Sequence, residues 1–219
     1  IIFNGFGRYE SSKFIRGLII KLIKIRKSSH ICIQSYRDFR FLRRFSGKNQ
    51  LDWIIGSGGT MRQTASNNTE KKLVITRTKK FQLLKKRLLD FDDLGAIDII
   101  GLETKWSLGE VQSLGKMEQD NIFNQHQKFL QLYYYGEGTP HSLVDAFSSN
   151  MDIYIDKKSF ISFGLYKFFE NVKFTKGLAI ITPKHIGYED FQKIIACKNI
   201  NVQYTAVIKK CLRRLGKGR

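Results

Sequence analysis

Two apolar patterns alternate along this chain of 219 residues: a helical period of three to four residues, and short continuous runs typical of buried strands. The helical pattern predicts helices at residues 12–27, 36–45, 71–90, 121–135, 159–172 and 188–197. The continuous runs predict strands at residues 30–34, 51–55, 96–101, 142–145, 152–155, 177–182 and 202–207. This alternation favours an α/β fold built on a mainly parallel sheet flanked by helices.

Positive charge is concentrated in three blocks that contain almost no acidic residues. Residues 1–48 hold twelve Lys or Arg against two acids, residues 71–89 hold eight against none, and residues 209–219 hold six against none. At a net charge of +19, this distribution costs self-repulsion, so we expect a polyanionic partner to neutralise it. Phosphate backbone is the first candidate, and a merely solvated basic surface is the alternative.

The first predicted helix has two interpretations. One face is apolar and the other is basic: Phe14, Ile15, Leu18, Ile19, Leu22 and Ile23 against Arg16, Lys21, Lys24 and Lys27. This pattern describes a packed surface helix, and it also describes a helix that lies on a membrane surface. No uncharged apolar stretch is long enough to span a membrane, so we expect no membrane span.

Cysteine and histidine spacing indicates neither a disulfide framework nor a metal site. The cysteines are odd in number and far apart, and the histidines fall in different predicted elements: Cys32, Cys197 and Cys211, and His30, His126, His141 and His185. Metal sites usually require closer, regular spacing of such ligands. We therefore expect no metal and a reducing environment.

Two glycine-rich segments, at residues 5–7 and 56–60, lack the sequence features of a nucleotide-binding loop. Neither ends in Gly-Lys-Ser/Thr, and neither matches the dinucleotide fingerprint. We therefore expect no nucleotide cofactor. The loop at 56–60, next to Arg62, is either a phosphate contact through backbone N–H groups or a plain turn.

Arginine and aromatic residues alternate between positions 36 and 45, a composition that suits RNA. Guanidinium groups bind phosphate in a fork, and the rings stack on bases or pack inward; in either case the arginines face outward. The predicted RNA contacts extend over this segment, the loop and the second basic block: Arg37, Arg40, Arg43, Arg44, Lys48, Arg62, Lys79, Lys80, Lys85, Lys86 and Arg87.

Acidic residues leave an alternative from the enzyme class. Asp90, Asp92 and Asp93 form a compact cluster, and Asp98, Glu103 and Lys105 follow the Asp then Glu-x-Lys order of metal-dependent nucleases. A solvated loop and helix end explains the same residues without any chemistry.

Taken in order, several short motifs resemble the S-two family of small-subunit ribosomal proteins, its mitochondrial members in particular. The strand at 30–34 is followed by Trp53, Gly58, Gly59 and Thr60, and Leu94 to Ile100 resembles the family's Leu-Pro-Asp strand, with Asp98 as the Asp. The most specific part comes later: Pro140, Val144-Asp145, Asp152, Tyr154-Ile155 and the segment from Ser162 to Tyr166.

The resemblance implies a doubly wound α/β domain over residues 1–169, carrying the loop and a basic helix at 56–90, and a C-terminal extension with a basic tail over 170–219. It further implies a structural, non-catalytic subunit of the mitochondrial small ribosomal subunit. Its partners would be ribosomal RNA and neighbouring ribosomal proteins, with no small-molecule substrate. A basic accessory subunit of another organelle complex is a further alternative.

Overall fold

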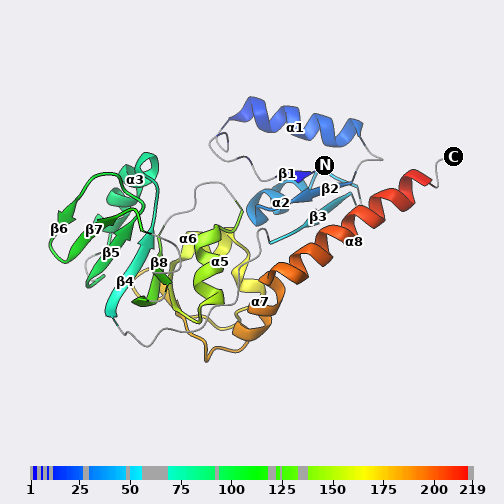
Figure 1. Cartoon of the computed structure of the whole chain (residues 1–219). Coiled ribbons are helices and arrows are strands. Elements are labelled where there is room, and N and C mark those ends of the chain that lie inside the picture. The colour runs from blue at the N-terminus through cyan, green and yellow to red at the C-terminus, as the bar shows by residue number, and fades with distance from the viewer. Residues whose placement is uncertain are drawn as a thin grey trace.

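The computed structural model of the chain describes most of its length. The described residues are 2–3, 6, 9, 12–26, 30–47, 50–55, 69–91, 94–117, 122–123, 125–132 and 138–216. They form two lobes, each built on its own sheet, one parallel and the other mainly parallel (Figure 1).

The small lobe has a three-stranded parallel sheet in the order β1-β2-β3, formed by Ile2–Phe3, Ile31–Ile33 and Leu51–Trp53. Two helices accompany it, α1 (Lys13–Ile25) and α2 (Tyr36–Leu42). Each helix begins at a serine whose hydroxyl accepts a backbone N–H, Ser12 from Ile15 and Ser35 from Asp38, both at 3.3 Å. Apolar side chains from both helices close the core of this lobe over β2.

The large lobe has a seven-stranded sheet in the order β10-β9-β8-β4-β5-β7-β6. The strands are β4 (Thr69–Ile75), β5 (Ile97–Ile100), β6 (Ser107–Leu108), β7 (Val111–Gly115), β8 (His126–Gln131), β9 (Asp152–Asp156) and β10 (Leu178–Ile181). The five inner strands are parallel, and only the edge strands β6 and β10 pair antiparallel.

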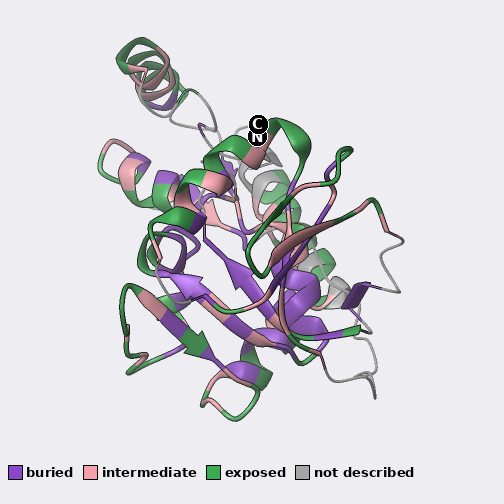
Figure 2. Ribbon diagram, turned by 90° about the vertical axis from the view of Figure 1, so that its left-hand side faces the viewer, coloured by how far each residue is buried: buried purple, intermediate pink, exposed green. Residues whose placement is uncertain are grey.

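Helices cover both faces of the large sheet. The helical elements are α3 (Thr78–Leu89), α5 (His141–Ser148), α6 (Lys157–Ser162), the 3-10 turn η2 (Leu165–Lys167), α7 (Tyr188–Ile195) and α8 (Cys197–Gly216). On one face α5, α6 and α7 pack in the core that holds Leu73, and on the other α3 packs in the core that holds Val74. The buried residues follow the strands of this sheet (Figure 2). The predicted fold class, a doubly wound and mainly parallel α/β sheet, is confirmed.

Several predicted elements agree with the structure, and five do not. The predicted helix at 71–90 is wrong for its first five residues, which belong to β4, and the predicted helix at 121–135 is wrong for residues 126–131, which form strand β8. The predicted strands at 142–145 and 202–207 are helical, in α5 and α8. The predicted long helix at 159–172 is the short α6 followed by η2.

The two lobes are joined by aromatic packing and by α8. The Tyr36 ring of α2 lies 5.7 Å from the ring of Tyr166 in η2, and the two hydroxyls are 2.8 Å apart. The long helix α8 leaves α7 and runs along the small lobe, where Tyr204 accepts a hydrogen bond from Gln34 and Lys210 pairs with Asp52 (Figure 1). Residues beyond position 170 thus contribute β10 and α7 to the large lobe, while the predicted division at that position stays a prediction.

Gly101, just past β5, has a backbone geometry that no other residue fits. Its φ is +98°, and a Cβ there would lie 2.1 Å from the Thr76 carbonyl oxygen. We expect Gly101→Ala to cost at least about 3 kcal/mol of unfolding free energy, because the strain and the backbone clash add. Gly109→Ala is the matched control: its φ of +55° is also left-handed, but nothing lies within 4 Å, so about 1 kcal/mol is expected. Urea denaturation measures both, and equal losses would contradict the clash.

Candidate functional site

The predicted RNA-contacting arginines of α2 lie on the surface of the small lobe. Arg37, Arg40, Arg43 and Arg44 are exposed. The aromatic residues between them pack inward, since Tyr36 is buried and Phe39 and Phe41 join the core of the small lobe. The Arg43 guanidinium lies 5.8 Å from the centre of the Phe39 ring, so this ring contacts an arginine of the protein itself. The four arginines are on the surface, but these rings do not form a base-stacking platform.

The second predicted group lies on α3, in the large lobe. Lys79 and Lys86 are exposed, whereas Lys85 rests 5.5 Å from the Trp106 ring centre and Arg87 pairs with Asp90 at 3.2 Å. Lys80 is half-buried. Lys48, Arg62 and the glycine-rich loop at 56–60 lie outside the described residues.

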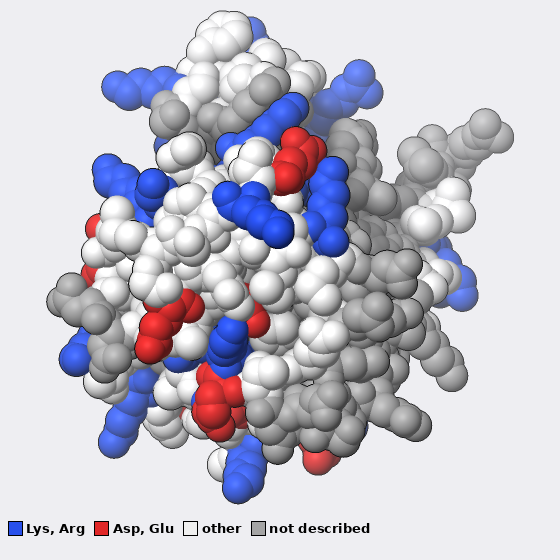
Figure 3. All heavy atoms as spheres, turned by 60° about the vertical axis from the view of Figure 1, so that its left-hand side comes forward, with Lys and Arg blue, Asp and Glu red and all other residues white. Residues whose placement is uncertain are grey.

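The structure does not bring these two groups together. Helices α2 and α3 belong to different lobes and lie far apart (Figure 1). On the face seen in Figure 3, blue Lys and Arg side chains are spread out and interspersed with red acidic ones. The predicted contacts therefore lie on separate basic areas of the molecule and form no single continuous patch on that face.

A different site follows from the order of the strands. The chain moves from β4 to β5 and β7 on one side and then returns to β8 and β9 on the other side of β4. In open parallel sheets, ligands bind outside the carboxyl ends of the strands where the order reverses in this way. In this fold that position is the carboxyl end of the pair β4 and β8, beyond Ile75 and Gln131.

The residues at the end of β4 form an electropositive helix start. Arg77 is the N-cap residue of α3 and its side chain makes no capping bond, no acid occupies the first turn, and Lys79 and Lys80 follow. Helix N-termini already carry a partial positive charge, so cations at this position are unfavourable unless an anion binds between them. Nearby, the Thr78 hydroxyl accepts the Glu103 backbone N–H at 3.3 Å, which fixes the loop after β5 beside this helix start.

Two threonine hydroxyls at this edge are buried and have no hydrogen-bond partner among the residues that the structure describes. Thr76 follows β4 and is 7% exposed, and Thr139, on the chain that returns from β8, is 6% exposed. Buried polar atoms are paired with protein or water in almost all native structures, so these two hydroxyls are open to a hydrogen bond from a water or a ligand, as are those of Thr69 and Ser149 elsewhere in the fold. Both lie at the carboxyl edge that the strand order selects.

The small lobe faces the same edge. A Cβ at Gly138, before α5, would be 3.0 Å from the Gln34 Cβ, and a Cβ at Gly164, after α6, would be 2.7 Å from the Tyr36 ring. Gln34 and Trp53 stand at the carboxyl ends of β2 and β3, and the Trp53 indole donates to the Gln34 carbonyl at 3.1 Å. The carboxyl edges of the two parallel sheets therefore face each other.

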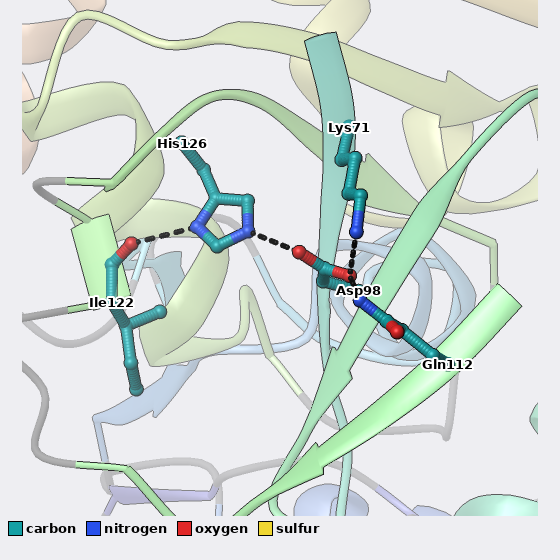
Figure 4. Close-up of polar contacts among 5 residues, drawn as sticks. All are labelled: Lys71, Asp98, Gln112, Ile122 and His126. Atoms are coloured by element: carbon teal, nitrogen blue, oxygen red, sulfur yellow. Dashed lines mark hydrogen bonds and ion pairs between the residues drawn. The ribbon is translucent and has the colours of Figure 1, made fainter. Parts of the chain in front are cut away.

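The nuclease candidate Asp98 belongs to a polar cluster near the opposite end of the sheet. Asp98, in the amino-terminal half of β5, accepts hydrogen bonds from Gln112 of β7 at 2.8 Å and Lys71 of β4 at 3.4 Å, and its other oxygen is 3.1 Å from His126 Nε2 (Figure 4). The remaining ring nitrogen of His126 lies 3.0 Å from the Ile122 carbonyl oxygen. The Asp98 carboxylate is thus surrounded by protein groups that hold four elements together.

The other two nuclease candidates lie elsewhere. Glu103 and Lys105 are exposed beyond the carboxyl end of β5, and Glu103 pairs with Lys116 at 3.3 Å. Asp92 and Asp93 lie outside the described residues. Within the described ranges, no three His, Cys, Asp or Glu side chains are grouped closely enough to hold a metal ion. The described residues therefore give the nuclease hypothesis no assembled site.

Sequence reasoning missed Thr76, Arg77, Thr78 and Thr139 as site residues. The signal was present as a buried run ending in Thr-Arg-Thr before a basic helix, but the run was included in that helix. Once β4 is recognised, the strand, the turn and the helix together predict an anion site.

Comparison with known proteins yields a likeness in fold. No protein-family model matches the chain, and no curated protein matches it. Among solved structures, the crystal structure of TarM, a glycosyltransferase, superposes with a TM-score of 0.55 at 13% sequence identity. The match covers 97% of this chain and 49% of TarM, so the chain spans about half the length of that protein.

The Asp98 cluster predicts an acid-sensitive contribution to stability. Burial alone would raise the pKa of Asp98, but hydrogen bonds from Gln112 and His126 and the charge of Lys71 outweigh it and lower that pKa. A carboxyl pKa that is lower in the folded state stabilises the fold above the unfolded-state pKa of about 3.9 and loses this effect as the pH falls through the folded-state value.

Asp98→Asn should therefore lower the unfolding free energy by about 1–3 kcal/mol at pH 7 and flatten its decline below pH 4. Asp90→Asn, at an exposed pair with Arg87, should change stability by less than about 0.5 kcal/mol. Urea titrations between pH 3 and pH 7 measure both. Identical acid sensitivity in Asp98→Asn and wild type would contradict this role.

Proposed function

We propose that this chain carries the donor-binding part of a glycosyltransferase, the part that holds the phosphate groups of an activated sugar. The observation that carries the proposal is the start of α3: an uncapped, acid-free helix N-terminus with Arg77, Lys79 and Lys80, at the point where the strand order reverses. The fold it shares with TarM supports the choice of sugar transfer among phosphate-dependent reactions.

The chemistry expected of such a site is stabilisation of a leaving group. When a sugar is transferred, the bond between its anomeric carbon and the phosphate oxygen breaks, and negative charge builds up on the departing phosphate. Cations and helix N–H groups that already point at this charge lower the barrier without reorganising. Arg77 and Lys79 fit this role, with the Thr76 and Thr139 hydroxyls as further hydrogen-bonding groups at the same edge.

The facing lobes support a reaction between two bound molecules. A donor held at the end of β4 would meet an acceptor presented from the small lobe, since the carboxyl ends of β2 and β3 point to the same junction. This proposal departs from the sequence-based expectation of a chain with neither catalytic activity nor a small-molecule substrate.

Arg77→Ala tests the site. Its side chain makes no capping bond, so the substitution should leave the fold intact. We expect uridine, guanosine or adenosine diphosphate to bind the full chain, and Arg77→Ala to weaken the best of them about tenfold, the loss typical of one charge-assisted hydrogen bond. Isothermal titration calorimetry measures the affinities.

Arg40→Ala, a surface arginine of the small lobe, is the matched control and should bind like wild type. Absence of binding by all three diphosphates, or equal weakening in both variants, would contradict the proposal. Release of free sugar from a nucleotide-activated donor in the presence of the chain would extend it from binding to catalysis.

A second candidate is the structural, RNA-binding subunit of the mitochondrial small ribosomal subunit that the sequence suggested. The observation that favours it is the net charge of +19 together with the exposed arginines of α2. Neighbouring ribosomal proteins would then be partners as well, and the mitochondrial matrix the location. An accessory role in another organelle complex would use the same surfaces.

Ribosomal RNA binding predicts a steep salt dependence. With six or more phosphate contacts, affinity should fall roughly a thousandfold between 50 mM and 200 mM salt, and Arg40→Ala with Arg44→Ala should reduce the slope by about two. Lys173→Ala with Lys184→Ala, exposed lysines outside the predicted set, should leave the slope unchanged. Filter binding measures the slopes, and salt-insensitive binding would refute this candidate.

Two further measurements separate the remaining alternatives. Cosedimentation with small ribosomal subunits distinguishes a ribosomal subunit from an accessory subunit of another complex. Labelled RNA incubated with the chain and magnesium should stay intact under both main candidates, whereas its cleavage would favour the nuclease.

A further inference from the structure

Helix α1 is apolar on two sides. Ile15, Ile19, Ile20 and Ile23 face the small lobe and pack with its core, where Ile23 is 2% exposed. Arg16 also faces inward, with its guanidinium 3.9 Å from the centre of the Phe41 ring. These contacts account for the attachment of α1 to the protein, so the outward side is not needed for packing.

The outward side of α1 nevertheless carries large apolar residues. Phe14 is 78% exposed, Leu18 46%, Leu22 51% and Ile25 64%. Their spacing of three and four residues places them in one stripe along the helix. Single exposed apolar residues are common, but a contiguous stripe of four on one helix indicates an interaction surface.

Lysines border this stripe. Lys13, Lys21 and Lys24 are exposed along one side of the stripe, and α1 contains no acidic residue. An apolar stripe flanked by lysines is complementary to the surface of an anionic bilayer, where the apolar side chains enter the acyl boundary and the lysines meet the headgroups. RNA phosphates would attract the lysines but leave the apolar stripe in water.

The length of α1 is compatible with a helix that lies along a membrane surface and does not cross the membrane. Its 13 residues extend about 20 Å, less than the hydrocarbon thickness of about 30 Å. Within the part of the chain that the structure describes, no helix is long and apolar enough to cross a membrane. The helix lies at the edge of the small lobe, away from the large sheet (Figure 1). It can therefore lie flat on a bilayer while the rest of the protein stays outside.

We propose that α1 is an interfacial helix that docks the protein on anionic lipid surfaces through Phe14, Leu18, Leu22 and Ile25, with Lys13, Lys21 and Lys24 contacting the headgroups. This docking requires neither the sugar transfer nor the RNA binding considered above. Under this proposal, one side of α1 attaches the helix to the small lobe and the exposed side binds the membrane.

Flotation of the full chain with vesicles tests the proposal. Vesicles of phosphatidylcholine with 30 mol% phosphatidylglycerol should carry the protein upward. Vesicles of pure phosphatidylcholine should carry at most about one tenth as much protein, because each lysine near an anionic surface adds to the attraction. Phe14→Gln with Leu22→Gln should lower binding to anionic vesicles at least about tenfold, since two exposed apolar side chains no longer enter the bilayer.

Matched variants separate the contributions. Leu89→Gln with Ile186→Gln removes two other exposed apolar residues outside α1 and should bind like wild type. Lys13→Glu with Lys21→Glu should lower binding about tenfold or more, whereas Lys173→Glu with Lys184→Glu, the same charge change on other exposed lysines, should lower it much less.

Three outcomes would overturn the proposal. The first is no flotation with anionic vesicles, and the second is unchanged flotation of Phe14→Gln with Leu22→Gln. The third is binding of a single-stranded RNA that depends on the same α1 residues while vesicles stay unbound, which would assign the surface to RNA instead. Circular dichroism of each variant confirms that the compared proteins are folded.

Discussion

The structure depends on the burial of β4 between two cores. Leu73 is fully buried in the core formed with α5, α6 and α7, and the next residue, Val74, is buried in the core formed with α3. Because successive side chains of a strand point to opposite faces, these two neighbours join both helical layers to one sheet. β4 also pairs with β5 and β8, so it is the strand from which the sheet grows in both directions. The polar Asp98 cluster reinforces this centre by linking β4 to β5, β7 and β8.

The sequence predicted the fold class because most buried runs are short and the helices between them are amphipathic. Ile31–Ile33 and Ile97–Ile100, buried at every residue, are strands of this kind. The prediction failed at β4 because Lys71 and Lys72 precede its short apolar run and resemble the start of the basic helix that follows. Both lysines have partners only in the tertiary structure, Lys71 at Asp98 and Lys72 at the Leu94 carbonyl oxygen, 2.5 Å away. The segment at 202–207 failed for the opposite reason: Val202 lies exposed on α8, so its apolar character does not indicate burial in a strand.

The two ends of the large sheet have different roles in this description. Near the amino ends, hydrogen bonds satisfy Asp98 and His126 within the protein. At the carboxyl ends, Arg77, Lys79 and Lys80 gather at a helix start that already favours anions, beside the hydroxyls of Thr76 and Thr139; among the described residues these two hydroxyls have no partner, and neither does that of Thr69 at the amino end of β4. Only the order of the strands brings Thr139 to the same edge as Thr76, and periodicity along the chain carries no information about strand order. For this reason the composition predicted a phosphate-bearing partner, whereas the position of the candidate site required the structure.

Helix α8 begins directly after α7 and reaches the small lobe, where Lys210 pairs with Asp52 at 3.2 Å and Tyr204 accepts from Gln34 at 2.6 Å. A single rigid rod anchored in this way acts as a strut between the two halves of the molecule. Besides loosening the Tyr36–Tyr166 contact, a change in the angle between them must either break these two contacts or turn at the junction of α7 and α8, where the backbone of Ala196 leaves the helical conformation. The junction of α7 and α8 is therefore the place where this strut can bend while it keeps both anchors on the small lobe.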